Sequence, residues 1–259
     1  MRRCASAASL RSAAPHRCAS LRSASLRSAA PHRPADLRPV DSGVMPVTLE
    51  LSDAATRDDL RVFLERLLRA GQPDVRMVSR GRALAVYGCV QAPRGITDSV
   101  PVVLVMRAFG LAEDPGAPVD ATVPGRALLD RIARLGFSGR RLDLPDASAL
   151  AAWAGVLPPT SGWMPQGALD GPSLGSVAAE GIERVAALLP ADPGEAVVHR
   201  VRASVWGLEM APGIPAAAAF AAEAMGFLKD APTVEVARSL TWVRLRTPRG
   251  HVLVRSLLG

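Results

Sequence analysis

One segment restricts the possible folds more than any other, the run Val100–Phe109, "VPVVLVMRAF". It is apolar at odd and even positions alike, so a strand formed here could leave neither face in water. It is far too short to cross a bilayer as a helix, which takes about 20 residues. The segment therefore predicts a central strand in a sheet that is covered on both sides.

The end of the chain predicts strands with only one apolar face. The segments "TWVRLRT" (241–247) and "HVLVRSL" (251–257) alternate apolar and polar side chains. Pro248 and Gly250, between them, are placed as in a type I turn with a bulge. Further strands are predicted over residues 46–51 and 233–239 and in a hairpin over 74–88 that turns near Arg80-Gly81.

Helical periodicity is clearest in "TRDDLRVFLERLLRAG" (56–71), where apolar residues recur every three or four positions and share one face. Thr56 is predicted to cap this helix, and Gly71 to end it in a left-handed conformation. Four more helices are predicted over residues 122–136 (capped by Thr122, ended by Gly136), 173–189, 195–207 and 214–228.

This order of elements, with strands at both ends and helices between them, is typical of an α+β fold. We expect an antiparallel or mixed sheet from N- and C-terminal strands, with about five helices packed on it. Residues 45–259 would form one domain. The stretch 143–172 is poor in regular structure, with three prolines and two glycines in "LPPTSGWMPQG" (157–167), and it keeps a two-lobed arrangement open.

The first 44 residues differ in kind from the rest. They carry eight arginines against Asp36 and Asp41, which is 8 − 2 = +6 of the total charge of +7, and they repeat "SLRSAAPHR" twice without an aromatic residue. Such composition predicts disorder. Three interpretations stay open: an organellar transit peptide, a basic arm that binds nucleic acid weakly through its charge, or a start codon placed too early, with Met45 as the true start.

Several kinds of chemistry lack their residues beyond this tail. Only His199, His251 and Cys89 could supply nitrogen or sulfur ligands, and no pair has metal-ligand spacing. No glycine-rich phosphate loop is present. We therefore expect no metal, no cofactor and no catalytic residue. A single cysteine also excludes an internal disulfide beyond the tail, which favours the cytoplasm, and no membrane segment is expected.

The stretch "GPSLG" (171–175) matches G-x-S-x-G, the pattern that carries the nucleophile of α/β-hydrolases. That site needs a strand before the serine, and the preceding "WMPQGALD" is interrupted by proline and glycine. We therefore interpret Ser173 as a helix cap. A small-molecule hydrolase using Ser173 remains the alternative function.

Two surface features could contact a partner. Arg244, Arg246 and Arg249 line the final hairpin, either as a solvated face that protects a sheet edge or as an anion- or partner-binding surface. Trp163 lies in the proline-rich loop, where it either holds the loop to the core or contacts a ligand. The sequence favours a non-enzymatic cytoplasmic protein that binds a protein or other macromolecule, with these four as candidate binding residues.

Three segments together resemble an uncharacterised family of actinobacterial proteins: "VRMVSRGRALAVYG" (75–88), "GVLPPTSGW" (155–163) and "WVRLRTPRGHVLVR" (242–255), with "LRVFLERLLR" (60–69) ahead and "AMGFL" (224–228) between. In that family an L-P-P-x-x-G-W loop precedes the helices and a W-x-R-L-x-x-P-x-G hairpin ends the chain. The resemblance covers about residues 57–255 and implies one whole-length domain but no activity, and the tail 1–44 is not expected in the family.

Overall fold

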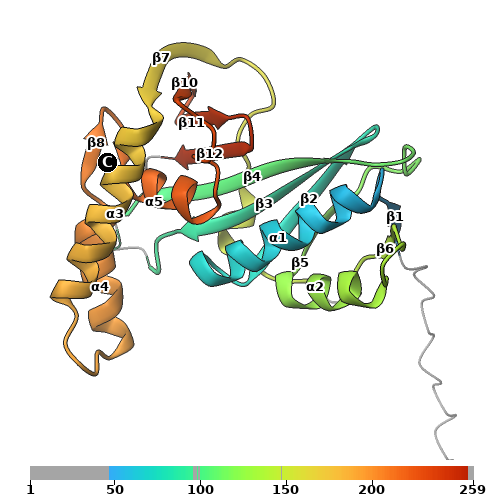
Figure 1. Cartoon of the computed structure of the whole chain (residues 1–259), viewed down its shortest axis with the longest axis horizontal. Helices are drawn as coiled ribbons and strands as arrows, with labels where there is room; N and C mark the ends of the chain where they lie inside the picture. Colours follow the sequence, from blue (N-terminus) through green and yellow to red (C-terminus); the bar gives the residue numbers. More distant parts are fainter. Residues whose placement is uncertain (1–46, 96–97, 99, 147, 256–259) are drawn as a thin grey trace, which may run out of the picture. The chain divides into compact units, whose positions relative to one another are not determined.

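A computed structural model describes residues 47–95, 98, 100–146 and 148–255. The disorder expected of residues 1–44 and the start expected at Met45 lie outside these residues. The main strands are β2 (Asp74–Arg80), β3 (Ala83–Gln91), β4 (Val102–Gly110), β5 (Asp120–Pro124), β7 (Met164–Asp170), β10 (Thr233–Ser239), β11 (Trp242–Thr247) and β12 (Gly250–Arg255). They form one antiparallel sheet in the order β5-β2-β3-β4-β12-β11-β10-β7 (Figure 1).

Five α-helices accompany this sheet in the described residues: α1 (Ala54–Ala70), α2 (Gly125–Arg134), α3 (Gly171–Leu188), α4 (Glu195–Trp206) and α5 (Ala216–Ala224). The minor elements are the strand pairs β1 (Thr48–Glu50) with β6 (Arg141–Asp143) and β8 (Glu209–Ala211) with β9 (Ile214–Pro215), and a 3-10 turn, η1 (Ala152–Gly155). The α+β fold predicted from the sequence is confirmed.

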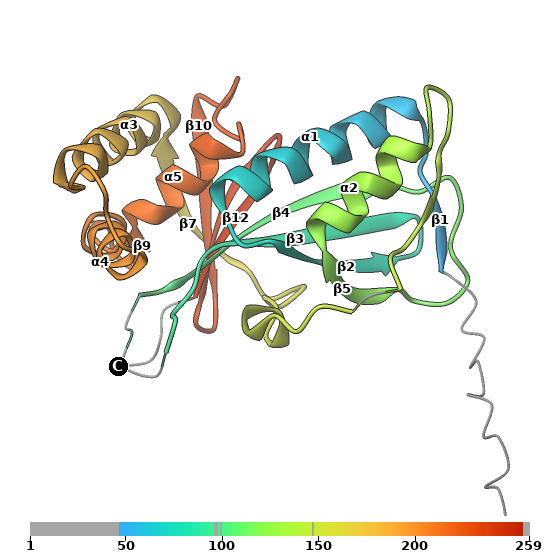
Figure 2. The same ribbon diagram turned by 90° about the horizontal axis from the view of Figure 1, so that it is seen from below.

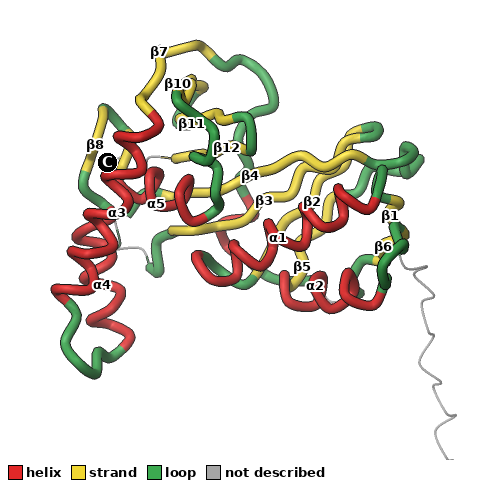
Figure 3. Tube along the Cα trace, in the orientation of Figure 1, coloured by secondary structure: helices red, strands yellow, loops and turns green. Residues whose placement is uncertain are grey.

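The helices gather on one face of the sheet (Figures 2 and 3). α1 and α5 pack directly on the central strands, α2 packs on β2 and β5, and α3 and α4 pack on α5. The apolar stripe of α1 is buried here, with Leu60, Phe63, Leu64 and Leu67 each at most 2% exposed. This interior forms because burial of such side chains is the main favourable contribution to folding.

β4 is covered on both faces, as its sequence requires. Val103 and Val105 point into the core beneath the helices, whereas Val102 and Leu104 belong to a second cluster on the opposite face. That second face is crossed by the chain around η1, which lies on the other side of the sheet from the helices (Figure 2).

The sheet is assembled from two similar halves. α1 precedes the meander β2-β3-β4, and α5 precedes the meander β10-β11-β12. β4 and β12 pair antiparallel at the centre, with Leu104 opposite Leu253, and each meander has an additional edge strand, β5 or β7. The chain therefore contains two helix-and-meander units, which are joined by the pairing of β4 with β12.

The predicted ends of α1 were wrong. Asp53, and not Thr56, caps the helix: its side chain accepts a hydrogen bond of 2.7 Å from the Thr56 amide. Gly71 has an extended backbone with φ −131°, not a left-handed one. Glycine is required at this position for a different reason: a Cβ would collide with the carbonyl oxygen of Cys89.

Neither of the two edge strands, β5 and β7, was predicted from the sequence. Residues 120–124 pair with β2, so Thr122 lies in β5 and cannot cap α2, although Gly136 does take the expected left-handed conformation with φ +65°. β7 forms within the stretch expected to be irregular. It contains Pro165, and an edge strand tolerates proline because its outer side needs no donor.

Candidate partner-binding surface

The face of the sheet opposite the helices is closed in part by the loop that carries η1. Trp153 and Ala154 are buried there against Leu104, Leu253 and neighbouring side chains of the sheet. Arg76 of β2 donates to the Ala154 carbonyl oxygen and also pairs with Asp120. The loop is therefore fixed to this face by both apolar and polar contacts.

The same loop places Trp163 against β11. The Trp163 indole Nε1 donates to the Pro159 carbonyl oxygen at 3.0 Å, which holds the ring in place. The Arg244 guanidinium lies over this ring, 4.4 Å from its centroid, in a cation–π arrangement. Trp163 and Arg244, which were predicted separately as binding residues, are thus in contact with each other.

Arg244 has no neutralising partner among the described residues. It is half-buried, it forms no ion pair with a described carboxylate, and its Nε is buried without a hydrogen-bond partner among the described residues. Burial, and then the charge of Arg246, lower the pKa of Arg244, and Glu235 opposes this only in part. Arg244 is therefore a partly desolvated charge without a carboxylate partner among the described residues.

Arg246 continues the surface along β11, where the strand register sets its neighbours. Glu235, Arg246, His251 and Met106 are consecutive cross-strand partners on β10, β11, β12 and β4, so their side chains share one face. Arg246 pairs with Glu235 at 3.2 Å, and both side chains remain more than half exposed. This ion pair is open to water.

His251 lies beside these arginines and is held neutral. Burial, then Arg244 and Arg246, lower its pKa to about 4. Its Nδ1 is buried and has no hydrogen-bond partner among the described residues. We name Trp163, Arg244, Arg246 and His251 the arginine–tryptophan surface.

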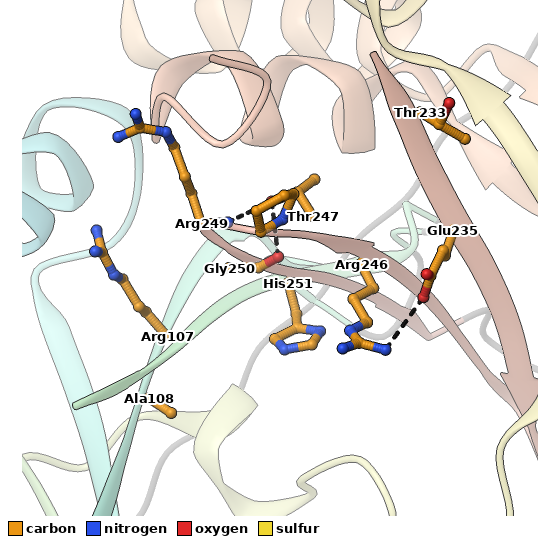
Figure 4. Close-up of a pocket in the computed structure, with 10 residues that line it drawn as sticks. Arg107, Ala108, Thr233, Glu235, Arg246, Thr247, Arg249, Gly250 and His251 are labelled. Carbon is orange, nitrogen blue, oxygen red and sulfur yellow. Dashed lines mark hydrogen bonds and ion pairs between the residues drawn. The ribbon is translucent and has the colours of Figure 1, made fainter. Parts of the chain in front are cut away.

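A groove of about 560 Å³ opens at the end of this surface (Figure 4). Its lining comes from β4, β10, β11 and β12 and the turn between the last two: Arg107, Ala108, Thr233, Glu235, Arg246, Thr247, Pro248, Arg249, Gly250 and His251. In Figure 4, Arg246 and His251 point to one side of the strands and Arg107 and Arg249 to the other.

Arg249, the fourth candidate from the sequence, is engaged within the fold. Its Nε donates to the Lys229 carbonyl oxygen at 3.1 Å, and it pairs with Asp230 at 2.8 Å. Arg107 is likewise paired, with Asp59 at 2.5 Å. Both line the groove, but unlike Arg244 each already has a carboxylate.

His251 and Glu235 were not among the binding residues predicted from the sequence, where His251 was considered as a metal ligand. The signal was present: a turn at Pro248-Arg249 sets Thr247 opposite Gly250 and therefore Arg246 opposite His251. The pairing with Glu235 required the register between β10 and β11, which the sequence did not specify.

Ser173 has a different setting from the one expected. A strand does precede it, because β7 ends at Asp170 and α3 begins at Gly171. Ser173 is nevertheless not the cap. Asp170 is, and its Oδ2 accepts from the Ser173 amide at 2.8 Å and from the Ser173 hydroxyl at 2.7 Å. These hydrogen bonds lower the pKa of Asp170.

No described histidine bonds to Ser173. His199 is hydrogen-bonded through Nε2 to Asp98 at 3.0 Å, and His251 belongs to the arginine–tryptophan surface. A serine nucleophile needs a base within hydrogen-bond reach. In the described residues the Ser173 hydroxyl instead donates to a carboxylate that caps a helix.

Other reactive groups are sparse. Cys89 is buried, and burial raises the pKa of its thiol to about 12, which disfavours the reactive thiolate form in the folded protein. Within the described ranges, no group of three or more His, Cys, Asp or Glu side chains could hold a metal ion. None of the helices in the described part of the chain has the length and apolar character to cross a membrane.

Two family models match the chain, and they divide it at the η1 loop. Residues 45–155 match "Domain of unknown function (DUF8010)", and residues 158–259 match "Domain of unknown function (DUF8185)". No curated protein matches. The boundary separates the β5-β2-β3-β4 half of the sheet from the β12-β11-β10-β7 half.

Solved structures with some likeness include DNA polymerase sliding clamps. The β sliding clamp of Caulobacter crescentus has 14% identity and a TM-score of 0.45, over 82% of this chain and 65% of that one. The DNA polymerase III subunit beta of Pseudomonas aeruginosa has 18% identity and a TM-score of 0.43, over 83% and 65%. This chain thus spans slightly less than two thirds of their length. By the two family models, each half of the sheet is similar to one domain of unknown function.

Proposed function

We propose that this protein binds another macromolecule, specifically a protein with an acidic segment, through the arginine–tryptophan surface. The observation that carries the proposal is Arg244: a half-buried guanidinium that is stacked on Trp163 and has no carboxylate among the described residues. Burying a charge without a partner is costly, and an acidic side chain of a binding partner would remove that cost.

The geometry suits a protein partner. Arginine and tryptophan are enriched at the centres of protein interfaces, where a few such residues supply most of the binding free energy. Because Trp163 is held by Pro159 and in turn holds Arg244, little side-chain freedom is lost on binding. Arg246 lies along the same face and could exchange Glu235 for a carboxylate of the partner.

The resemblance noted in the sequence supports the same surface. The L-P-P-x-x-G-W loop contributes Trp163, and the W-x-R-L-x-x-P-x-G hairpin contributes Arg244. The two motifs thus meet in one contact. We infer that chains with both motifs share this surface, and that the protein acts in the cytoplasm, since Cys89 has no cysteine partner beyond the tail.

Fluorescence can report on this surface directly. Of the four tryptophans, all described, Trp153, Trp206 and Trp242 are buried and only Trp163 is partly exposed. A change in emission when an acidic, non-aromatic peptide is added would therefore come mainly from Trp163. Binding should weaken with salt, because exposed charges are screened.

The test compares two double variants. Arg244→Ala with Arg246→Ala removes two charges from the surface, and Arg126→Ala with Arg134→Ala removes two exposed charges from α2. Charge-assisted hydrogen bonds of roughly 1.5–3 kcal/mol correspond to at least about tenfold weaker peptide binding in the first variant. The control should stay within about twofold of the unmodified protein. Equal binding by both variants would exclude this surface.

A second candidate, hydrolysis by Ser173, has one observation in its favour, the strand β7 that leads into α3. Labelling by a fluorophosphonate probe tests it, with Ser176 of the same helix as the comparison. Labelling that is lost in Ser173→Ala and kept in Ser176→Ala would favour the hydrolase, whereas absence of labelling removes it.

A further inference from the structure

We propose that a second site, independent of the arginine–tryptophan surface, binds a small organic anion that carries a phosphate or carboxylate group. The site is a cavity of about 370 Å³ between the end of α1, the chain that leaves β3, and α4. Its charged and polar lining includes Arg69, Arg94, His199 and Arg202. Cavities of roughly 300–1,000 Å³ are the usual size for small-molecule sites.

Arg202 carries the inference. It projects from α4, is half-buried, and makes no ion pair or hydrogen bond with any described residue. Its guanidinium carbon lies 5.5 Å from the centroid of the Phe220 ring, in a cation–π arrangement. Burial, followed by the charge of Arg94, lowers the pKa of Arg202. A desolvated charge with a like charge nearby is unfavourable until an anion joins it.

The carboxylates near the cavity are occupied by other groups. Glu195 pairs with Arg94 at 2.7 Å at the exposed rim. Asp98 accepts from His199 at 3.0 Å, and also from the backbone amides of Arg94 and Val100. Arg69 donates its Nε to a backbone carbonyl, that of Glu65. Arg202 and Arg69 thus have no carboxylate partner among the described residues, and the cavity lining carries three arginines and no carboxylate.

The remaining lining is apolar and indicates what the anion is attached to. Val90, Val100 and Val198 line the cavity together with alanines of α1 and α4. An anionic group beside the arginines and a short apolar body beside the valines would satisfy both parts. Such a ligand would also join the two halves of the chain, because α1 and β3 belong to one and α4 to the other.

The probes are phenyl phosphate and benzoate, each compared with sodium chloride at equal ionic strength. Both carry a flat apolar body, and they differ in the anionic group, so their relative effects distinguish a phosphate from a carboxylate ligand. A ligand that binds only the folded protein raises the melting temperature in proportion to the logarithm of its concentration. At least one probe should raise it well beyond the salt control.

The decisive variant is Arg202→Met, which keeps an unbranched stem against Phe220 but removes the charge. It should bind the effective probe at least about tenfold more weakly, as loss of a charge-assisted hydrogen bond implies. Without ligand it should melt no lower than the unmodified protein, because the charge it removes is unpaired. Arg200→Met, on an exposed position of the same helix, is the matched control and should keep the full effect.

Arg94→Gln provides a second variant with the same expected loss of binding, should Arg202→Met fail to fold. The site is refuted if neither probe exceeds the salt control, or if both variants keep the ligand-induced rise in melting temperature. Peptide binding by the arginine–tryptophan surface should be unchanged in these variants, so the two proposals succeed or fail separately.

Discussion

Leu64→Ala is the most direct test of how α1 is docked on the sheet. Leu64 is fully buried in the middle of the helix's apolar stripe. The substitution removes three carbons, and at about 0.8 kcal/mol for each the lost transfer free energy is about 2.4 kcal/mol. The cavity left among Leu60, Leu67 and the sheet adds to this, so the free energy of unfolding should fall by about 3–5 kcal/mol.

Thermal and urea unfolding both measure this loss. For a domain of this size each kcal/mol corresponds to about 2–4 °C, so the melting temperature should fall by about 6–20 °C. The control is Leu150→Ala in an exposed loop residue, where the expected change is within about 0.5 kcal/mol. If Leu64→Ala cost less than about 1 kcal/mol, well below the range for buried leucines, then α1 would not be packed as described.

Two further predictions concern the helix cap and the buried histidine. Asp170→Ala should lower the melting temperature more than Ser173→Ala, because Asp170 accepts both hydrogen bonds at the start of α3; the reverse order would restore Ser173 as the cap. His251 has a folded-state pKa of about 4, below its ordinary value of 6.5, so the unfolded chain binds the proton first and stability should be lost as the pH falls from 6.5 through 4. In His251→Phe this loss between pH 7 and pH 4.5, measured by urea unfolding, should be smaller, and an unchanged loss would contradict the assignment.

The regular elements with strong periodicity were determined by the sequence alone. A helix or a strand presents fixed sequence positions to one face, so an apolar pattern predicts which face is buried. This holds for the apolar stripe of α1, for β4, which is apolar on both faces, and for the alternating strands β11 and β12. Their order along the chain also determined the fold class. Even the turn at Pro248-Arg249 could be predicted from residue type.

Short edge elements depended on their neighbours. β5 and β7 contain proline, and in β7 also glycine, and neither has a pattern that predicts a strand. They form because β2 and β10 offer unpaired backbone groups at the two sheet edges. Capping behaved similarly: Asp53 and Asp170 lie just before the predicted helix starts, and the choice among nearby polar residues is made by backbone geometry.

The sites were decided by tertiary structure. Trp163 and Arg244 were each visible in the sequence, but only the path of the η1 loop across the sheet brings them into contact. Arg202 attracted no notice in the sequence, since one arginine in a helix resembles another. Arg202 is notable because it is half-buried and has no carboxylate partner among the described residues. Both properties depend on residues far away in the sequence. Local patterns follow from the periodicity of the backbone, whereas the neighbours of a charge follow from strand register and helix packing.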